Sequence, residues 1–405
     1  MNILFTSPRC LIDPSSGAAL ACKTMLERLA ARGHRVTAFG TTVFDRPEFA
    51  SPGDFLGSLG ARIKDQPHGE PVWTHAADGV RYYGTIARHQ RRNLMFAAEE
   101  LVFFRVLQAL VARDRPDIVM TFGGKLLDLH CYSWLHEAGI PIVFYLANPS
   151  YRRRDTFRHV DVVTTDSEAT ATLYRQRLGL EVVVIGKFIE PAQAAPDAPH
   201  DCVTLVNAEP RKGVAILVGI AHRMAREGSA TRFLVVESRG RLDTALEAWG
   251  LTRADIPNVE VLPVQPNLNA VWSRTRVLLQ PSLWHESGPR TVLEAYSLGI
   301  PVLATRSGGL PETVGDERFL FPVPEELRDN HLARPAAATI DAWLARLRTL
   351  LEDPQAYAEA SRLARARWDE QAQGAGTARL EALLEQTIRR RREGSSPDEA
   401  PDAGR

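Results

Sequence analysis

Two glutamates, Glu286 and Glu294, stand in the most informative stretch of the chain, QPSLWHESGPRTVLEAYSLGIP at residues 280–301. An apolar strand is predicted to end at Pro281-Ser282, and a loop carrying Glu286 follows. Gly288-Pro289 is then expected to open a helix, with proline in the tolerated first turn, and Gly299 to close it. The pattern predicts one carboxylate on the loop outside the helix and the other more than one turn inside it.

The beginning of this helix is predicted to bind an anion. Around Gly288, Pro289, Arg290 and Thr291, the N–H groups other than proline's own have no partner within the helix, and such groups suit phosphate oxygens. A diphosphate bound there would separate two groups that carry hydroxyls. One glutamate would then accept hydrogen bonds from a sugar and the other from a ribose, because carboxylates are good acceptors for paired hydroxyls.

Two further loops carry candidate residues. The segment VNAEPRKG at 206–213 again links a strand to a helix, and Arg211 and Lys212 would neutralise a diphosphate and stabilise it as a leaving group. Gly213 would let the backbone approach closely. Near the N-terminus, Ser15-Ser16-Gly17 precedes the first predicted helix as a flexible glycine turn, which is expected to face the same site.

Strands alternate with helices in two series, which is typical of parallel sheets covered on both faces. A hairpin is predicted around Asp78-Gly79, while residues 44–100 otherwise show no readable motif. The predicted strands are Asn2–Thr6, Val36–Phe39, Asp117–Thr121, Pro141–Leu146 and Asp161–Thr165, then Val203–Val206, Phe233–Val236, Val259–Leu262, Val277–Gln280 and Pro301–Thr305. The fold class is therefore α/β, with two facing, doubly wound domains and a cleft between them, and ligands are expected beyond the carboxyl ends of the strands.

The predicted domain boundaries follow composition. Residues 1–190 form the first domain, the Ala- and Pro-rich segment 191–201 a linker, and residues 202–370 the second domain. A C-terminal helix at 371–393 is expected to pack back toward the first domain, and residues 394–405 to form a disordered tail. Four consecutive arginines at 389–392 favour a solvated helix end, while peripheral contact with a membrane surface stays open.

The composition excludes several classes of protein. The 405 residues contain 49 Lys and Arg and 49 Asp and Glu, which argues against a general electrostatic grip on nucleic acid. The four cysteines are scattered, so we interpret them as reduced cytosolic thiols and not as a disulfide frame or a zinc site. The start MNILFTSPRC is not a signal peptide, and no apolar run could span a bilayer. We therefore expect a soluble, cytoplasmic protein.

The segment ESGPRTVLE, from Glu286 to Glu294, resembles the E-x(7)-E motif of glycosyltransferase family 4. The surrounding residues agree: Pro281-Ser282, EAYSLGIPVLAT at 294–305, SGGLPE at 307–312, Lys212-Gly213, and ERLAARGHRVT at 27–37 together with Gly17. The resemblance implies a GT-B fold, with residues 1–190 as the acceptor-side domain and residues 202–370 as the nucleotide-sugar-binding domain. It also implies a retaining, metal-independent hexosyltransferase that needs no cofactor beyond its nucleotide-sugar substrate. The sugar would be transferred to a hydroxyl of a polysaccharide, a glycolipid or a small molecule.

The resemblance also implies roles for individual residues. Glu286 would bind the donor sugar, Glu294 the ribose, and Lys212 and the backbone near Gly288 the diphosphate, which itself helps to deprotonate the incoming hydroxyl in many members. The catalytic residues are thus Glu286 and Lys212. Donor-binding residues are Gly17, Arg211, Gly288, Pro289, Arg290, Thr291, Glu294 and Asn148.

The sequence departs from the family pattern at two positions. Asn207 stands where many members have an arginine, and Arg211 or Arg290 would substitute for it. Ala147-Asn148 occupies the turn where many members have a histidine, and Asn148 would offer its amide to a hydroxyl. Two alternatives stay open: another GT-B enzyme, such as an epimerase or a pseudo-glycosyltransferase, and a non-catalytic module that binds nucleotide-sugars. The oligomeric state is open.

Overall fold

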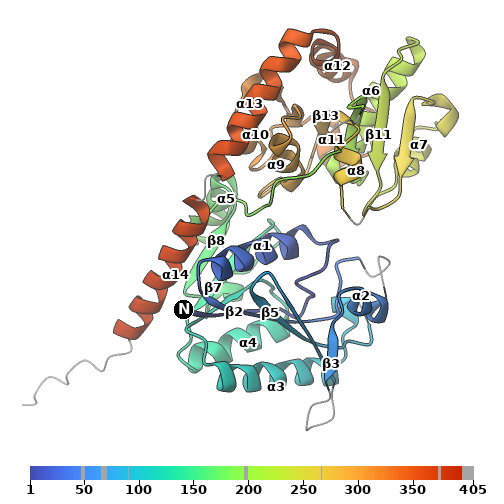
Figure 1. The fold of residues 1–405 in the computed structure, drawn as a ribbon. Coiled ribbons are helices and arrows are strands. Elements are labelled where there is room, and N and C mark those ends of the chain that lie inside the picture. The colour runs from blue at the N-terminus through green and yellow to red at the C-terminus, as the bar shows by residue number, and fades with distance from the viewer. Residues whose placement is uncertain are drawn as a thin grey trace, which may run out of the picture. The chain divides into compact units, whose positions relative to one another are not determined.

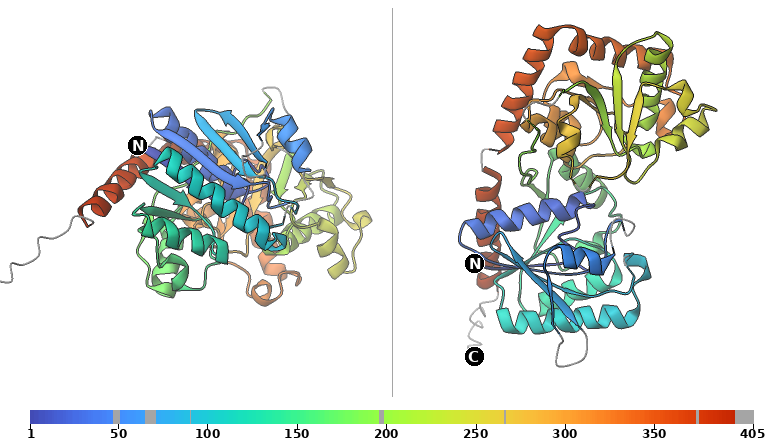
Figure 2. Two further views of the ribbon diagram at one scale, coloured as in Figure 1. Left: turned by 90° about the horizontal axis from the view of Figure 1, so that it is seen from below. Right: turned by 45° about the vertical axis from the view of Figure 1, so that its right-hand side comes forward.

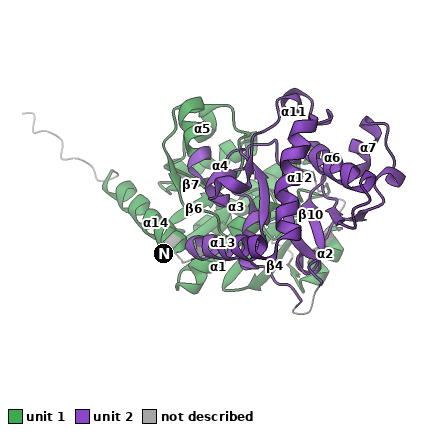
Figure 3. Ribbon diagram, turned by 90° about the horizontal axis from the view of Figure 1, so that it is seen from above, with its two compact units in different colours: residues 1–165, 171–188, 374–405 green, residues 166–170, 189–373 purple. Residues whose placement is uncertain are grey.

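The computed structural model describes residues 1–46, 51–64, 71–89, 91–195, 199–265, 267–372 and 375–394. The chain divides into two compact units, which Figure 3 shows in two colours. Unit 1 comprises residues 1–165, 171–188 and 374–405, and unit 2 comprises residues 166–170 and 189–373. The chain thus crosses into unit 2 near the predicted boundary at residue 190, and it returns to unit 1 near the predicted start of the C-terminal helix.

Unit 1 contains a nine-stranded sheet, counted over the described residues, in the order β3-β4-β5-β2-β1-β6-β7-β8-β9. The strands from β5 to β9 in this order run parallel, whereas β3 and β4 are antiparallel additions at one edge. The strands are β1 (Asn2–Thr6), β2 (Arg35–Thr41), β3 (Arg62–Lys64), β4 (Val72–Ala77), β5 (Val80–Thr85), β6 (Ile118–Thr121), β7 (Ile142–Leu146), β8 (Val162–Thr165) and β9 (Val182–Val184).

Helices cover both faces of this sheet, with α1 on one face and α3 and α4 on the other (Figures 1 and 2). The helices are α1 (Gly17–Ala31), α2 (Pro52–Ser58), α3 (Ala97–Asp114), α4 (Leu126–Glu137), α5 (Glu168–Leu178) and α14 (Ala375–Glu393), with 3-10 turns η1 (Arg92–Leu94) and η2 (Arg154–Phe157). Cys22, Met25, Leu26 and Leu29 of α1 are all buried, so this face of the helix packs into the core. Gly33, with φ +90°, follows the end of the helix, as is common for glycine.

The predicted hairpin at Asp78-Gly79 is confirmed. Strands β4 and β5 pair antiparallel with Ala77 opposite Val80, which leaves a two-residue turn. Both turn residues have positive φ, +52° for Asp78 and +78° for Gly79, as a type I′ turn requires. The hairpin adds β4 to the edge of the parallel sheet, a feature that the alternation of strands and helices alone does not predict.

Helix α14 packs on unit 1, although it follows all of unit 2 in the chain. Its residues Leu380, Leu384 and Ile388 are buried in the same apolar cluster as Met25 and Leu29 of α1. The carboxylate of Glu381 accepts hydrogen bonds from Arg32 (2.6 Å) and from His34 (2.8 Å) beside the end of α1. The helix therefore completes one face of unit 1.

Unit 2 contains a sheet whose described strands are all parallel, in the order β12-β11-β10-β13-β14-β15. The strands are β10 (Cys202–Val206), β11 (Arg232–Val236), β12 (Val259–Leu262), β13 (Thr275–Gln280), β14 (Val302–Thr305) and β15 (Leu320–Phe321). The helices are α6 (Val214–Arg226), α7 (Leu242–Ala248), α8 (Asn269–Trp272), α9 (Arg290–Ser297), α10 (Leu310–Val314), α11 (Glu326–Asp329), α12 (Ala337–Glu352) and α13 (Pro354–Ala372), with 3-10 turns η3 (Pro210–Lys212), η4 (Arg253–Asp255) and η5 (Glu317–Phe319).

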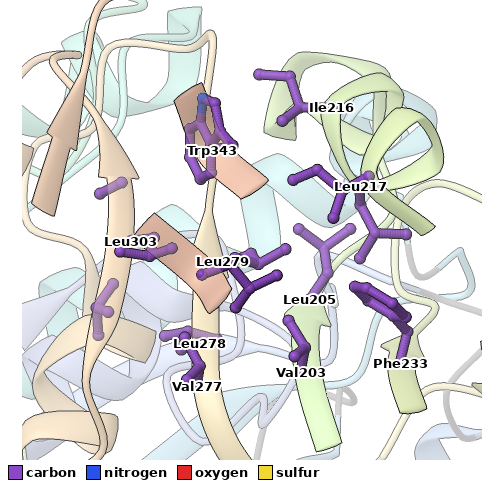
Figure 4. Packing of buried hydrophobic residues seen from close by; sticks show 14 of the residues in the cluster. Val203, Leu205, Ile216, Leu217, Phe233, Val277, Leu278, Leu279, Leu303 and Trp343 are labelled. Atoms are coloured by element: carbon purple, nitrogen blue, oxygen red, sulfur yellow. The ribbon is translucent and has the colours of Figure 1, made fainter. Parts of the chain in front are cut away.

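The core of unit 2 lies between this sheet and α6, α9, α12 and α13. Figure 4 shows Leu205 of β10 and Leu279 of β13 near Leu217 of α6, with Trp343 of α12 above β13. Such a core fixes the positions of the strand ends, because interiors pack as densely as crystals and tolerate few shifts. The predicted linker packs on this unit. The N–H groups of Ala192 and Ala195 donate to the hydroxyls of Ser297 and Ser273. The predicted tail, apart from Gly394, lies outside the described residues.

Candidate functional site

The predicted site residues of unit 2 come from loops that follow β10 and β13, which are neighbours in the sheet. Turn η3, with Lys212, follows β10, and the loop with Glu286 follows β13. Because the strands are parallel, both loops leave the same edge of the sheet, where ligands bind in this type of fold. A third loop, at 307–309, follows the adjacent strand β14 and leaves the same edge.

The connection from β13 to α9 has the predicted strand–loop–helix form, with one difference. Pro289 is the N-cap of α9, and the helix begins at Arg290, so proline lies just before the first turn and not within it. Gly299 closes the helix with φ +72°, as predicted. Glu286 before the helix and Glu294 within it are both buried, with 8% and 7% of their surface exposed. Burial of two carboxylates so close together requires partners for both.

The partner of Glu286 is Lys212. The ammonium nitrogen of Lys212 lies 2.5 Å from Oε1 of Glu286, and their side chains are only 23% and 10% exposed. Gly213 makes this approach of the two loops feasible, because a Cβ there would lie 1.9 Å from the carbonyl oxygen of Pro281. Its φ of +80° also favours glycine. The structure thus brings the two predicted catalytic residues together as a charge-assisted hydrogen bond.

Gln280 extends this contact into a chain of hydrogen bonds that the sequence does not predict. Its amide nitrogen lies 3.4 Å from Oε1 of Glu286, and its amide oxygen accepts a hydrogen bond of 3.0 Å from the hydroxyl of Thr291. Gln280 is the last residue of β13 and is buried. It therefore connects the loop carboxylate to the first turn of α9. The signal in the sequence that could have identified Gln280 is a glutamine at the end of a predicted apolar strand.

Glu294 is held by Arg290, one turn earlier on α9. The guanidinium Nε of Arg290 donates to Oε1 of Glu294 at 2.6 Å. The second carboxylate oxygen, Oε2, is buried and has no hydrogen-bond partner among the described residues. An unsatisfied buried carboxylate oxygen is costly, and a ligand hydroxyl would provide the missing donor.

Arg211, next to Lys212, points elsewhere. Two nitrogens of its guanidinium donate to Oε1 of Glu209 at 2.9 and 2.6 Å, and the group lies 4.7 Å from the centre of the Trp284 ring. Its own carbonyl oxygen accepts from the N–H groups of Leu283 and Trp284. Arg211 is thus a brace between η3 and the loop after β13, with a guanidinium that is about half exposed.

Asn207, where many members of the resembled family have arginine, adopts φ +72°. This left-handed conformation is more accessible to asparagine than to residues with long side chains. Its side-chain oxygen accepts a hydrogen bond from the backbone N–H of Arg239 at 3.1 Å. The departure at this position therefore has a local structural reason.

Backbone contacts that the sequence does not predict surround Glu286 and Gly288. The N–H of Gly309 donates to the carbonyl oxygen of Glu286 at 2.6 Å, and a Cβ on Gly308 would lie 2.3 Å from that oxygen. A Cβ on Gly288 would lie 2.5 Å from a carboxylate oxygen of Asp166. The conformation of the Glu286 loop thus depends on three glycines, and Asp166 joins the site from a segment far away in sequence.

Gly17 and Asn148, the other two predicted donor contacts, belong to unit 1. Gly17 is the first residue of α1, after the N-cap Ser16, and a Cβ there would meet open space. It therefore begins the helix, whereas a flexible turn before the helix was expected. The side-chain oxygen of Asn148 accepts from the N–H of Ser150 at 2.9 Å, which stabilises the turn after β7. That leaves the amide NH₂ of Asn148 as the group able to donate.

The described residues were also considered for a metal site and for a membrane-spanning helix. Within the ranges that the structure describes, no cluster of three or more His, Cys, Asp or Glu is arranged to hold a metal ion. In the same ranges, none of the helices combines the length and the apolar character needed to cross a bilayer.

Solved structures with the same fold define the class of this architecture. The catalytic domain of starch synthase IV from Arabidopsis thaliana, bound to ADP and acarbose, superposes with a TM-score of 0.71 at 12% identity, over 96% of this chain and 99% of that one. Sucrose-phosphate synthase from Thermosynechococcus elongatus gives 0.67 at 16% identity, over 96% and 99%. HepE from Anabaena with UDP and glucose gives 0.66 at 16% identity, over 95% and 99%. The chain has the GT-B fold of glycosyltransferases, as predicted.

Sequence comparison points in the same direction for part of the chain. The family model described as Glycosyl transferases group 1 matches residues 200–353. WcaL of Escherichia coli strain K12, which is named as a colanic acid biosynthesis glycosyltransferase, is 24% identical over 157 residues, 37% of each chain. One chain of the human phosphatidylinositol N-acetylglucosaminyltransferase is 26% identical over 185 residues, 41% of this chain and 35% of the relative. The present chain thus matches little more than a third of the length of these relatives.

Proposed function

We propose that the chain is a glycosyltransferase that moves a sugar from a nucleotide-diphosphate donor to a hydroxyl group of an acceptor, with retention of configuration at the anomeric carbon and without a metal ion. The observation that carries this proposal is the pair of buried glutamates on either side of the start of α9. Glu294 keeps a buried oxygen without a hydrogen-bond partner among the described residues, and such an oxygen needs a donor such as a ribose hydroxyl.

In this proposal the start of α9 and Lys212 hold the diphosphate. The helix has eight residues, so its first N–H groups and its dipole favour an anion beside Arg290. Lys212 donates to Glu286 at 2.5 Å, and in this proposal its flexible side chain turns from that carboxylate toward a phosphate oxygen. Positive charge at this place stabilises the diphosphate as it leaves. Electrostatic stabilisation of this kind is usually the largest single contribution to catalysis.

Glu286 binds the sugar hydroxyls when Lys212 turns to the diphosphate. Its carboxylate would then retain the hydrogen bond from Gln280 and gain acceptor capacity for the sugar. The departing diphosphate takes the proton of the incoming hydroxyl, as the family resemblance implies, so no further base is needed. Gly17 and Asn148 would supply contacts to the donor from unit 1, with the amide NH₂ of Asn148 as the donor of a hydrogen bond.

The names of relatives guide the choice of substrates. HepE binds UDP and glucose in its solved structure, and the human relative is named as a phosphatidylinositol N-acetylglucosaminyltransferase. UDP-sugars are therefore the first donors to test, followed by GDP- and ADP-sugars. The acceptor in this proposal is a hydroxyl of a polysaccharide, a lipid-linked glycan or a small molecule, and the protein acts in the cytoplasm.

A screen for donor hydrolysis tests the proposal without an acceptor. Release of nucleoside diphosphate is measured for each nucleotide-sugar with the wild-type chain, in the presence and absence of EDTA. NMR of the released or transferred sugar reports its anomeric configuration before mutarotation. We expect hydrolysis of one class of donor, insensitive to EDTA, with the configuration retained.

Variants connect the activity to the site. Glu286→Gln should abolish most of the hydrolysis, while Glu325→Gln, which alters an exposed glutamate of unit 2, should not. Binding of a nucleotide-sugar without hydrolysis or transfer to any acceptor would contradict the enzymatic assignment and favour a binding module. Conversion of the donor into an isomeric nucleotide-sugar would indicate an epimerase.

A further inference from the structure

A second set of charged residues lies at the carboxyl ends of strands in unit 1. Strands β5, β2, β1 and β6 are neighbours and run parallel, so the loops that follow them leave one edge of the sheet. Arg9 follows β1, Arg92 follows β5, and Lys125 follows β6. Three loops that are far apart in sequence therefore bring three cations to the edge where ligands bind in such sheets.

These cations are only partly neutralised. The guanidinium of Arg9, 38% exposed, lies 3.6 Å from the carboxylate of Asp45. The side chain of Lys125 is exposed, and within the part of the chain that the structure describes its ammonium group makes no hydrogen bond or ion pair. Exposed or loosely paired cations are what a bound anion requires.

Arg92 provides an independent indication of a missing ligand. Its side chain is only 7% exposed, and Nη1 donates to Oε1 of Glu100 at 2.6 Å. The other terminal nitrogen, Nη2, is buried and has no hydrogen-bond partner among the described residues. Arginine is rarely buried without complete pairing, because each unsatisfied donor costs free energy. An anion oxygen would supply the acceptor that Nη2 lacks.

The three cations lie near enough to one another to interact electrostatically. Burial and the charges of Arg92 and Arg9 lower the pKa of Lys125, while Asp128 and Glu100 counteract this effect. Burial raises the pKa of Asp128, while the N–H of Lys125 and the charges of Arg92 and Arg9 counteract this effect. Asp128 itself accepts from the N–H of Lys125 at 2.7 Å and packs against Gly123, so it shapes the loop.

We propose that Arg9, Arg92 and Lys125 bind a phosphoryl group, and, resting on the proposed function, that this group belongs to the acceptor. Two guanidinium groups and one ammonium group offer more donors than the two oxygens of a carboxylate accept. A phosphate monoester presents three terminal oxygens and up to two negative charges, which matches three cations from three loops better. The acceptor is thus a phosphorylated compound with a free hydroxyl.

Apolar side chains next to two of the cations identify a second source of the phosphate to be tested. Leu126, adjacent to Lys125 in sequence, is 83% exposed, and Leu94, in the same 3-10 turn as Arg92, is 46% exposed. The phosphoryl group could come from a soluble phosphate monoester or from a lipid headgroup. Both sources contain the same chemical group, and the test separates them.

The test measures direct binding by the full-length chain. The soluble probe is glycerol phosphate, with glycerol as its uncharged counterpart, and binding is measured by titration calorimetry. The lipid probe is phosphatidylcholine vesicles with and without phosphatidic acid, and binding is measured by cosedimentation. We expect saturable binding to at least one probe that carries phosphate and none to its counterpart.

Two variants and one matched control assign the binding to this site. Lys125→Gln and Arg9→Gln should each weaken it by about tenfold, since a hydrogen bond to a charged group is lost. Arg105→Gln removes one charge from an exposed position on α3 and should leave binding unchanged. Absence of phosphate-dependent binding, or an equal loss in Arg105→Gln, would overturn the proposal. So would binding that is lost in Lys212→Gln but kept in the two unit 1 variants.

Donor hydrolysis, measured in parallel, separates this proposal from the function on which it rests. If Lys125→Gln loses phosphate binding but hydrolyses the donor like the wild type, both proposals are supported. Donor hydrolysis without any phosphate binding would refute only the acceptor site. Phosphate binding that depends on Lys125 in a chain that neither binds nor hydrolyses nucleotide-sugars would refute the proposed function and retain the anion site.

Discussion

The two units both place charged side chains where parallel strands end, but they pair them differently. In the site of unit 2, Lys212 is bonded to Glu286 and Arg290 to Glu294, and a carboxylate oxygen has no partner among the described residues. In the charged cluster of unit 1, the groups without a partner in the described part of the chain are the ammonium of Lys125 and one nitrogen of Arg92. The first arrangement offers an acceptor to hydroxyls, and the second offers donors to an anion. The unpaired polar groups of the two sites are thus of opposite kind, an acceptor in unit 2 and donors in unit 1.

The largest expected effect tests whether unit 2 is the catalytic side of this comparison. Glu286→Gln keeps the shape of the side chain but removes the charge that, in the proposed mechanism, binds the sugar in the transition state. We expect donor turnover to fall by about 100- to 1,000-fold, measured as release of nucleoside diphosphate at saturating donor. Turnover within a factor of two of wild type would remove Glu286 from the mechanism.

A pair of neighbouring variants asks which cation of η3 serves the diphosphate. Lys212→Met should weaken binding of nucleoside diphosphate on the order of 10- to 100-fold, because a charge-assisted hydrogen bond is lost. Arg211→Met should have a much smaller effect, since its guanidinium is bonded to Glu209 and lies over Trp284. Calorimetric titration measures both, and thermal melting controls for the unpaired Glu286 that Lys212→Met leaves buried. A larger effect of Arg211→Met than of Lys212→Met would indicate that Arg211 replaces the arginine that many members of the resembled family have where this chain has Asn207.

Modified nucleotides test whether the unpaired oxygen of Glu294, Oε2, accepts a hydrogen bond from the ribose. Glu294→Gln should lower the affinity for a ribonucleoside diphosphate by about tenfold. A nucleotide without ribose hydroxyls should bind the wild type and the variant equally well, because the contact in question is absent from both complexes. A loss of equal size for both nucleotides would show that Glu294 acts through Arg290 and not on the ribose.

The smallest expected effect concerns the C-terminal helix of unit 1. Hydrogen bonds from Arg32 and His34, which outweigh burial, lower the pKa of Glu381. The contribution of this contact is therefore present above the pKa of an unfolded glutamate, about 4.3, and is lost as pH falls through the lower folded value. We expect the protection of the α14 amides, measured relative to their intrinsic exchange rates at each pH, to fall over that acidic range. Glu381→Gln should show the lower protection already at neutral pH, and equal protection at neutral pH would contradict this role.

Much of the fold could be predicted from sequence because short apolar runs bounded by glycine and proline mark buried parallel strands. Strands β1 and β12 have the predicted bounds, and the turn residues Asp78 and Gly79 identify their hairpin. Helix α3 and strand β9 were not predicted, because the first lies largely beyond a stretch without readable motifs and the second has only three residues. The grouping of residues 166–170 with unit 2 also follows from contacts that no local pattern encodes.

Part of the candidate site was predictable for a related reason. Glu286 and Glu294 stand in a contiguous block, so spacing alone places them around one helix start. Gln280, Asp166 and the glycines at 308 and 309 reach the same place through sheet order and backbone contact, and their residue types are common elsewhere. Arg9, Arg92 and Lys125 become neighbours only once the order β5-β2-β1-β6 is known.

Helix α14 has a consequence for the way the protein is made. Unit 1 buries Leu380, Leu384 and Ile388, which a ribosome adds only after every residue of unit 2. The part of unit 1 that is synthesised first therefore has the apolar face that α14 covers exposed until unit 2 has been translated. Exposed apolar surface on folding intermediates promotes aggregation and binding by chaperones. Chains that end before this helix would therefore expose an apolar surface that chaperones can recognise.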